Sequence, residues 1–248
     1  MPTDQKSIAH SARQRKPTLR TIADRTGFAV TTVSRALKGD PLISEKTRET
    51  VSSAAAEVGY VPDRAAQRLR TGRTKVISLL VNPAHEFLGF TAELLTGLTS
   101  ALDGTGYSVT IIPDFIRQDR VEAVRNILRN NLADGLIFTR TEAFDERVRV
   151  LLEADFPFVT HGRTEFSLPH PYVDFDNEAY ARLAVRRLVE IGRRRLGIIL
   201  PEARFTFTQL LRYGFMAAAR EAGVDFEFLD KVNLDSSPDR ISAQVLQR

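Results

Sequence analysis

From residue 75 onward, short apolar segments alternate with longer segments of helical periodicity, and this alternation constrains the fold more than any other feature. The first apolar segment, residues 75–81, is continuous, as expected of a strand that is buried on both faces. Further buried strands are expected at 107–112, 135–139, 157–161 and 196–200. The intervening helices are expected at 91–102, 119–130, 145–154, 178–191 and 209–222. This order predicts an α/β body with doubly wound parallel sheets.

The segment before residue 75 instead predicts three short helices, at 19–25, 30–37 and 45–58. Thr18 and Ser44 are suitable N-caps for the first and third helices. Gly27 permits a sharp bend between the first two, because glycine adopts positive φ without steric cost. Two short helices joined by a glycine turn and braced by a third form a helix-turn-helix module.

Charge is divided unequally between these two regions. Residues 1–75 contain 15 Lys and Arg against 7 Asp and Glu, whereas residues 76–248 contain 20 against 24. A basic first third followed by an acidic remainder predicts a head that binds a polyanion and a separate globular body. A basic tail that only aids solubility is the alternative.

Composition excludes several other classes of protein. The chain has no Cys, which removes disulfides, thiolate zinc sites and Cys nucleophiles. No run approaches the roughly 18 apolar residues of a membrane span, and residues 1–16 are polar, unlike a signal peptide. We therefore expect a soluble intracellular chain with no membrane partner.

Motifs for enzymatic chemistry are scarce. The sequence lacks the GxGxxG and Walker A loops, the GxSxG elbow and the HExxH zinc motif. None of the four His lies three or four residues from another, which argues against a metal site. Asp174 and Asp176 could form a carboxylate pair, but Asp176 is better interpreted as the N-cap of the following helix. No catalytic residue, metal or cofactor is predicted.

The residue types and spacings of the head form a specific pattern. The pattern consists of Ile22, Ala23, Gly27, Thr32, Val33, Ser34, Arg35, Leu37, Gly39, Ser44, Thr47, Arg48, Val51, Gly59, Tyr60 and Pro62. With these residues, the segment 19–69 resembles the DNA-binding domain of the lactose-repressor (LacI/GalR) family of bacterial transcription regulators. The body resembles the family's effector domain, which is related to periplasmic sugar-binding proteins. Its matching segments are 133–137, 157–159, 162–163, 173–177, 192–195 and 214–223.

The resemblance implies four parts: a flexible basic arm at 1–17, a helix-turn-helix DNA-binding domain at 18–62, a hinge or linker at 63–74, and a partial effector-binding and dimerisation domain at 75–248. The expected fold class is therefore an α-helical head followed by an α/β body of periplasmic-binding-protein type. Measured against the family pattern, the second lobe of this body is incomplete, and we expect a fragment or a truncated gene product.

In the family, the second helix of the head enters the major groove and reads bases from the positions occupied here by Val30, Thr31 and Arg35. Arginine can hold guanine O6 and N7 together, while Val30 and the Thr31 methyl suit the methyl group of thymine. Ala29 replaces the usual Ser at the start of this helix, which predicts a missing side-chain cap. The predicted DNA contacts are Thr18, Leu19, Val30, Thr31, Thr32, Ser34, Arg35, Tyr60, Arg68, Leu69 and Arg70.

Residues 63–70 follow Pro62 and are too few to form a stable helix alone. In the family this hinge becomes helical on DNA, where two copies pair and a Leu wedges into the minor groove. Leu69 stands at that position, between Arg68 and Arg70, which suit phosphate contacts. Asp63 stands where Asn is more usual.

For the body, the resemblance implies a small-molecule effector, a sugar or related metabolite, bound between two lobes on aromatic and polar side chains. The predicted contacts are Phe87, Phe90, Arg163, Phe205 and Phe207. The four Phe could equally belong to the core. Leu211 stands where the family usually has an Arg that holds the ligand, and Arg212 is displaced from that position by one residue.

Together these features predict a sequence-specific DNA-binding transcription regulator, a repressor controlled by a sugar-like molecule. The resemblance implies a homodimer on a pseudo-palindromic DNA operator, located in the bacterial cytoplasm with the nucleoid. The alternative is a carbohydrate-modifying enzyme or a ligand-binding protein with a basic appendage. Salt-sensitive DNA binding would favour the regulator, and turnover of a carbohydrate would favour the enzyme.

Overall fold

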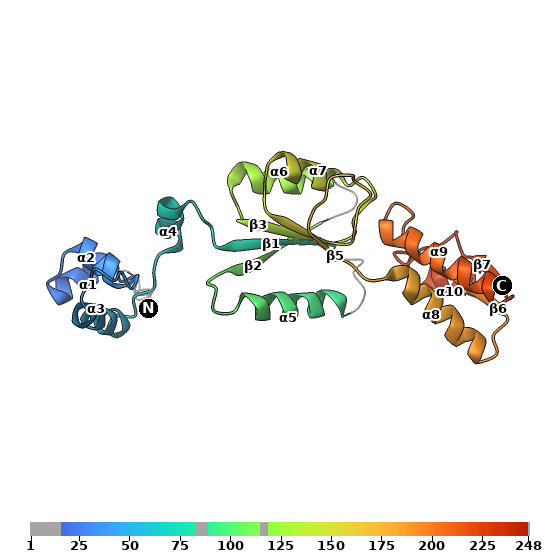
Figure 1. Cartoon of the computed structure of the whole chain (residues 1–248), viewed down its shortest axis with the longest axis horizontal. Coiled ribbons are helices and arrows are strands. Elements are labelled where there is room, and N and C mark those ends of the chain that lie inside the picture. Colours follow the sequence, from blue (N-terminus) through green and yellow to red (C-terminus); the bar gives the residue numbers. More distant parts are fainter. Residues whose placement is uncertain (1–15, 83–88, 115–118, 248) are drawn as a thin grey trace, which may run out of the picture. The chain divides into compact units, whose positions relative to one another are not determined.

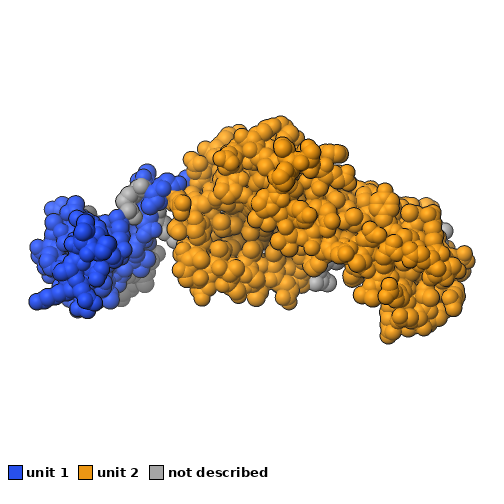
Figure 2. Space-filling view, in the orientation of Figure 1, with its two compact units in different colours: residues 1–72 blue, residues 73–248 orange. Residues whose placement is uncertain are grey.

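The computed structural model describes residues 16–82, 89–114 and 119–247. The chain divides into two compact units, residues 1–72 and residues 73–248, which we call the head and the body (Figure 2). Each unit has hydrophobic core residues of its own. The boundary at Gly72 falls inside the segment expected to act as a hinge.

Three helices of the head pack around one small core. They are α1 (Leu19–Thr26), α2 (Val30–Ala36) and α3 (Glu45–Glu57), each within one residue of its predicted bounds. The hydroxyl groups of Thr18 and Ser44 cap α1 and α3 as predicted, and Gly27 ends α1 with a φ of 73°. The buried core residues are Ile22, Ala23, Val33, Ala36, Val51, Ala54 and Ala55. This arrangement is the predicted helix-turn-helix module.

A fourth helix, α4 (Arg64–Thr71), occupies the expected hinge. Asp63 caps it by accepting hydrogen bonds from the amides of Ala65 and Ala66, at 2.7 and 3.3 Å. The described side chains of α4 are exposed or half-buried, so none of them belongs to a core. The segment is therefore a helix with a capped start and no buried face. Its expected dependence on DNA stays a prediction.

The body begins with a parallel five-stranded sheet in the order β2-β1-β3-β4-β5. The strands are β1 (Val76–Val81), β2 (Ser108–Pro113), β3 (Gly135–Phe138), β4 (Phe158–His161) and β5 (Tyr172–Val173). The helices that join them are α5 (Phe90–Leu102), α6 (Arg120–Asn130) and α7 (Glu146–Glu153). Helices α6 and α7 lie on one face of the sheet and α5 lies on the other (Figure 1). This first lobe confirms the predicted doubly wound fold.

The two faces of the first lobe are packed unequally. Residues of α6 and α7 bury a core against the sheet that includes Leu80, Val124, Ile127, Phe138 and Leu151. No residue of α5 is buried, and β2 leaves Ile111 49% exposed. Strand β2 is less buried than its apolar sequence predicts, because it lies at the edge of the sheet.

The rest of the described body forms a second lobe with α8 (Asn177–Glu190), β6 (Arg195–Ile198), α9 (Thr206–Glu221), β7 (Asp225–Phe228) and α10 (Pro238–Leu246). Strands β6 and β7 pair in parallel. Helix α8 approaches α9 so closely that a Cβ at Gly214 would lie 2.3 Å from the carbonyl oxygen of Glu178. Helix α9 begins three residues before its predicted start. The sequence prediction does not include β5, β7 or α10.

Among the described residues, no helix combines the length and the apolar character that a membrane crossing requires.

Candidate functional site

Helix α2 buries one side and exposes the other. Val33 and Ala36 belong to the core, with 0% and 3% of their surfaces exposed. Val30 is 41% exposed, Thr31 and Arg35 are also exposed, and Thr32 and Ser34 are half-buried. The three side chains predicted to read bases therefore lie on the outward side of one short helix. As predicted from Ala29, no side chain caps its first turn.

Arg35 lies in the last turn of α2 and forms an ion pair with Asp40 in the following turn. Its Nε donates to Oδ2 of Asp40 at 2.7 Å, and Oδ1 of Asp40 accepts from the amide of Leu42 at 3.0 Å. The hydrogen bond between the two side chains raises the pKa of Arg35 and lowers the pKa of Asp40, so both are ionised at neutral pH. Despite this pair, 47% of the Arg35 side chain is exposed.

The other predicted contacts in the three-helix core region have local structural roles. The Thr18 hydroxyl accepts from the amide of Thr21, and the Thr21 hydroxyl accepts from the amide of Thr18. Leu19 and Tyr60 are half-buried and pack against the core of the head. Burial raises the pKa of the Tyr60 hydroxyl, and the charge of Asp63 adds to this effect. Contacts of these residues with DNA stay predictions.

The hinge helix exposes a large apolar side chain. Leu69 is 89% exposed, more than any other large hydrophobic residue in the described part of the chain. Arg68 beside it is also exposed, while the side chain of Arg70 lies outside the description. An exposed Leu flanked by Arg has the composition of a minor-groove wedge with adjacent phosphate contacts.

In the body, aromatic and charged side chains gather where β4 ends. The Phe90 ring, at the start of α5, lies 4.8 Å from the imidazole of His161, and the Phe175 ring lies 5.3 Å from the same imidazole. Two residues beyond β4, the Nε of Arg163 donates to Asp174 at 2.7 Å. The Arg163 side chain is 41% exposed. Because parallel strands end at the same edge of the sheet, Phe90 and Arg163 both belong to the edge where ligands bind in open α/β sheets.

Polar contacts join this edge to the second lobe, and we call them the polar seam: Thr141 with Thr206, and Arg140 with Asp235. The amide of Thr206 donates to the carbonyl oxygen of Thr141 at 3.1 Å. Both terminal nitrogens of Arg140 donate to the Asp235 carboxylate, and these two side chains are only 9% and 10% exposed. The partners in these contacts are 65 and 95 residues apart along the chain. The seam therefore connects the two lobes independently of the covalent crossing between them.

Phe205 lies inside this seam. Its ring is fully buried, and the guanidinium carbons of Arg140, Arg204 and Arg120 lie 4.6, 4.9 and 5.9 Å from its centre. The half-buried Phe207 ring stacks on it at 5.6 Å. Phe205 thus packs among these side chains in this structure, and its contact with an effector stays a prediction.

The position of the family's ligand-holding Arg also has a different use in this chain. Leu211 packs against the core of the second lobe. Arg212 donates to Asp230 at 3.3 Å, and its guanidinium lies 4.2 Å over the Phe228 ring. Arg212 is therefore engaged within the second lobe. Phe87, also predicted to contact an effector, lies outside the described residues.

A buried charge cluster near the same edge is missing from the sequence prediction. Arg147 in α7 is 1% exposed and donates to both Asp114 and Asp145, each at 2.7 Å. Burial alone would raise the pKa of Asp145, but the Arg147 hydrogen bonds and charge outweigh burial and lower it. The available signal is that Arg147 shares the apolar side of α7 with Val148 and Leu151. A charged residue on the apolar side of a helix requires a buried partner.

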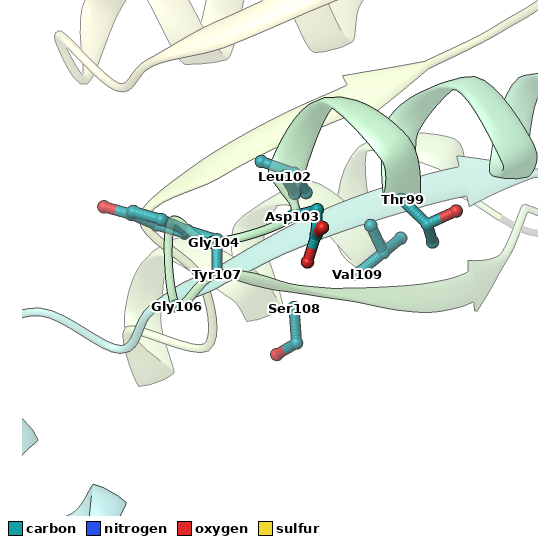
Figure 3. A pocket seen from close by; sticks show the side chains of 8 residues that line it. All are labelled: Thr99, Leu102, Asp103, Gly104, Gly106, Tyr107, Ser108 and Val109. Atoms are coloured by element: carbon teal, nitrogen blue, oxygen red, sulfur yellow. The ribbon is translucent and has the colours of Figure 1, made fainter.

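An open hollow of about 590 Å³ lies between the end of α5 and the start of β2 (Figure 3). It is at the opposite end of the strands from Phe90 and Arg163. The side chains of Tyr107 and Ser108 point in different directions rather than converging on one point, and Asp103 supplies the only charge in its lining. This hollow lacks the convergent polar groups of a ligand site. The described residues also contain no cluster of three or more His, Asp or Glu suited to a metal ion.

Comparison with known proteins assigns a family to each unit. Residues 18–63 match the family described as "Bacterial regulatory proteins, lacI family". Residues 74–246 match the family described as "Periplasmic binding proteins and sugar binding domain of LacI family". The second match alone covers more than half of the chain.

Individual proteins support these matches. The chain is 32% identical over 213 residues to the HTH-type transcriptional regulator AglR of Rhizobium meliloti, a match that covers 84% of this chain and 59% of AglR. The structure of the transcriptional regulator CelR–cellobiose complex is 29% identical, with a TM-score of 0.54 over 86% of this chain and 65% of that one. The lac repressor dimer bound to operator and the anti-inducer ONPF shares the fold, with a TM-score of 0.71 at 23% identity over 86% of this chain and 64% of that one. The chain thus spans about three fifths of the length of AglR.

Proposed function

This chain belongs to the LacI family of bacterial regulatory proteins, and from that premise we propose that it is a sequence-specific DNA-binding regulator that represses transcription. The outward side of α2 carries this proposal. A short helix that exposes Val30, Thr31 and Arg35 opposite a buried side can enter the major groove and reach base edges. The excess of basic residues in 1–75 would attract the phosphate backbone. Thr32 and Ser34 would contribute secondary contacts.

The hinge would add a second contact with DNA. We propose that Leu69 enters the minor groove while Arg68 and Arg70 contact phosphates on either side. The 89% exposure of Leu69 supports this role, because a wedge residue has to be available outside the protein core. Thr18, Leu19 and Tyr60 would then bring the backbone of the head close to the phosphates.

A pseudo-palindromic operator requires two heads, and we propose that the chain acts as a homodimer. The first lobe offers a surface for a second copy on α5 and the edge strand β2. None of the apolar residues of α5 is buried, and Ile111 of β2 is 49% exposed. Contact with a second copy would remove this apolar surface from water. The apolar residues of α5 are Phe90, Ala92, Leu94, Leu95, Leu98, Ala101 and Leu102.

We propose that the effector is a sugar or related metabolite bound at the edge of the first lobe beside Phe90 and Arg163. The family description of the body names sugar binding, and the CelR structure is described as a cellobiose complex. Aromatic rings pack against the C–H faces of sugars, while a guanidinium donates to their hydroxyl groups. Phe207 and Phe87 would complete the aromatic lining. Because Leu211 replaces an Arg, the polar contacts would come mainly from Arg163.

A regulator of this kind would act in the bacterial cytoplasm, on the nucleoid, and would need no catalytic residue. The decisive test is selection of bound duplexes from a randomised DNA library by the whole chain. We expect enrichment of a two-fold symmetric site that binds at least about 1,000-fold more tightly than a scrambled duplex. Turnover of a carbohydrate without enrichment of any DNA sequence would instead support the enzyme alternative.

A further inference from the structure

The ion pair between Arg35 and Asp40 is arranged so that only part of the guanidinium is occupied. The Nε of Arg35 donates to Oδ2 of Asp40 at 2.7 Å. Its two terminal amino groups donate to no other residue in the described part of the chain, and 47% of the side chain is exposed. The outer end of the guanidinium is therefore available while its inner edge is held.

The Asp40 carboxylate is held by the turn rather than by Arg35 alone. The backbone amide of Asp40 donates to the carbonyl oxygen of Arg35 at 3.2 Å, and the backbone carbonyl oxygen of Asp40 accepts from the amide of Ile43 at 3.0 Å. Oδ1 accepts from the Leu42 amide at 3.0 Å. Gly39 makes this turn possible with a φ of 71°. These backbone contacts hold the Asp40 carboxylate in one position just after α2. The hydrogen bond from the Arg35 Nε to this carboxylate then orients the guanidinium.

A fixed guanidinium distinguishes bases better than a mobile one. Arginine loses much rotamer freedom when it binds, and a contact that holds its Nε beforehand reduces that loss. The two outward N–H groups then match O6 and N7 of guanine, which both accept hydrogen bonds in the major groove. Adenine offers N7 but places an amino donor next to it, so one N–H group of Arg35 would face another donor.

We propose that Asp40 is a positioning residue that aligns Arg35 for a guanine, and so sets the base preference at one position of the half-site, a role that rests on the proposed DNA-binding function. Asp40 need not contact DNA to do this. Its effect reaches the base only through Arg35, which is how a carboxylate behind a ligand-binding group tunes that group. The partner that Arg35 and Asp40 recognise is accordingly a duplex with guanine at this position rather than any polyanion.

Asp40→Asn separates this role from a structural one. The Asn side-chain oxygen can still accept from the Leu42 amide, which preserves the turn, but the variant has no charge and its amide nitrogen cannot accept from Arg35. Glu57→Gln is the matched control. It neutralises a carboxylate that forms an exposed ion pair with Arg25 elsewhere in the head, at 2.6 Å.

The experiment uses the duplex selected by the whole chain and three derivatives that carry the other bases at the position most affected by Arg35→Ala. We expect Asp40→Asn to reduce the preference for guanine over adenine by about fivefold or more. Glu57→Gln should leave that preference unchanged. The double variant Asp40→Asn with Arg35→Ala should behave like Arg35→Ala alone, because a residue that acts only through Arg35 has nothing further to lose. Circular dichroism and thermal unfolding would confirm that each variant is folded.

Three results would overturn the proposal: an unchanged base preference in Asp40→Asn, an equal loss on all four duplexes, or additive losses in the double variant. The Arg35 Nε–H resonance gives a second measurement, since it should shift in Asp40→Asn before DNA is added. An unmoved resonance would contradict the positioning contact. If the unmodified chain selects no sequence, the proposed function itself fails, whereas a selected site with an indifferent Asp40→Asn removes only the role of Asp40.

Discussion

The head and the body use arginine–aspartate pairs in opposite ways. In the head, Arg35 pairs with Asp40 and keeps 47% of its side chain exposed. In the body, Arg147 pairs with Asp114 and Asp145 and is 1% exposed. Both arginines stand close to an aspartate in the sequence, so the sequence alone does not separate the two uses. Burial decides the role: an exposed guanidinium can still bind a partner, whereas a buried one is committed to holding the fold.

The largest effect should come from removing the buried charge. Arg147→Met keeps much of the side-chain volume but removes the cation that Asp114 and Asp145 share. Asp114 keeps its ion pair with Arg120, whereas the buried carboxylate of Asp145 loses its ion-pair partner. We expect the free energy of unfolding of the body to fall by about 3–5 kcal/mol, measured by urea denaturation. Arg149→Met on the same helix is the control, because Arg149 is exposed and the loss of its ion pairs should change the stability of the body much less. Equal losses for the two variants would show that burial does not distinguish these residues.

On the head, removal of the exposed arginine should change binding and leave the fold intact. Arg35→Ala should weaken binding to the selected duplex by about 1–3 kcal/mol and relax the preference at one base pair. Arg35→Lys should also weaken it, because Lys lacks the planar fork that engages guanine at two atoms. Fluorescence anisotropy on matched duplexes would measure both effects. A uniform loss on every sequence would mean that Arg35 contacts only phosphate.

Low pH should reduce the stability of the body more through its buried ion pairs than it reduces the stability of the head through the exposed pair of Arg35 and Asp40. The pKa of Asp145 is lowered in the folded protein, so its stabilising contribution is complete above the unfolded value of about 3.9 and is lost as the pH falls through the folded value. Stability of the body in urea should therefore hold from neutral pH to about 5 and decline below about 4. The pKa of Asp40 is also lowered, which gives the same sign, but its exposed pair is screened by solvent and should contribute little. A body that gains stability on acidification would contradict this assignment.

The sequence predicts the features that depend on local signals better than those that depend on distant residues. Helices and strands with strong periodicity were predicted within about three residues, and the caps at Thr18, Ser44 and Asp176 could be named, because these signals are local. The two-residue strand β5 and the four-residue strand β7 could not, since short strands depend on the neighbour with which they pair.

Contacts that depend on tertiary topology were also beyond the sequence. Arg147 and Asp114 are 33 residues apart, and Arg140 and Asp235 are 95 apart. Nothing in local periodicity indicates that such residues meet. The burial of Phe205 has the same origin, because Arg120 and Arg140 reach its ring from distant parts of the sequence. The hydrogen bond between Arg35 and Asp40 likewise depends on the turn geometry at Gly39 and Asp40.

The smallest effect should be found at an exposed pair with no proposed ligand. Arg25 and Glu57 form an ion pair in the head with more than half of each side chain exposed. Glu57→Gln should change the free energy of unfolding by less than about 1 kcal/mol and should leave DNA affinity nearly unchanged. Thermal unfolding at low and high salt would measure this. A loss comparable to that of Arg147→Met would remove the contrast between exposed and buried pairs.

The central claim is that the head binds DNA in a sequence-specific manner through the outward side of α2. Its most direct measurement is the affinity of the whole chain for its selected duplex and for a scrambled duplex, over a series of salt concentrations. The account predicts that the logarithm of the association constant falls linearly with the logarithm of salt concentration on both duplexes, with the selected duplex bound more tightly throughout. Salt-independent binding, or equal affinity for the two duplexes at every salt concentration, would contradict it.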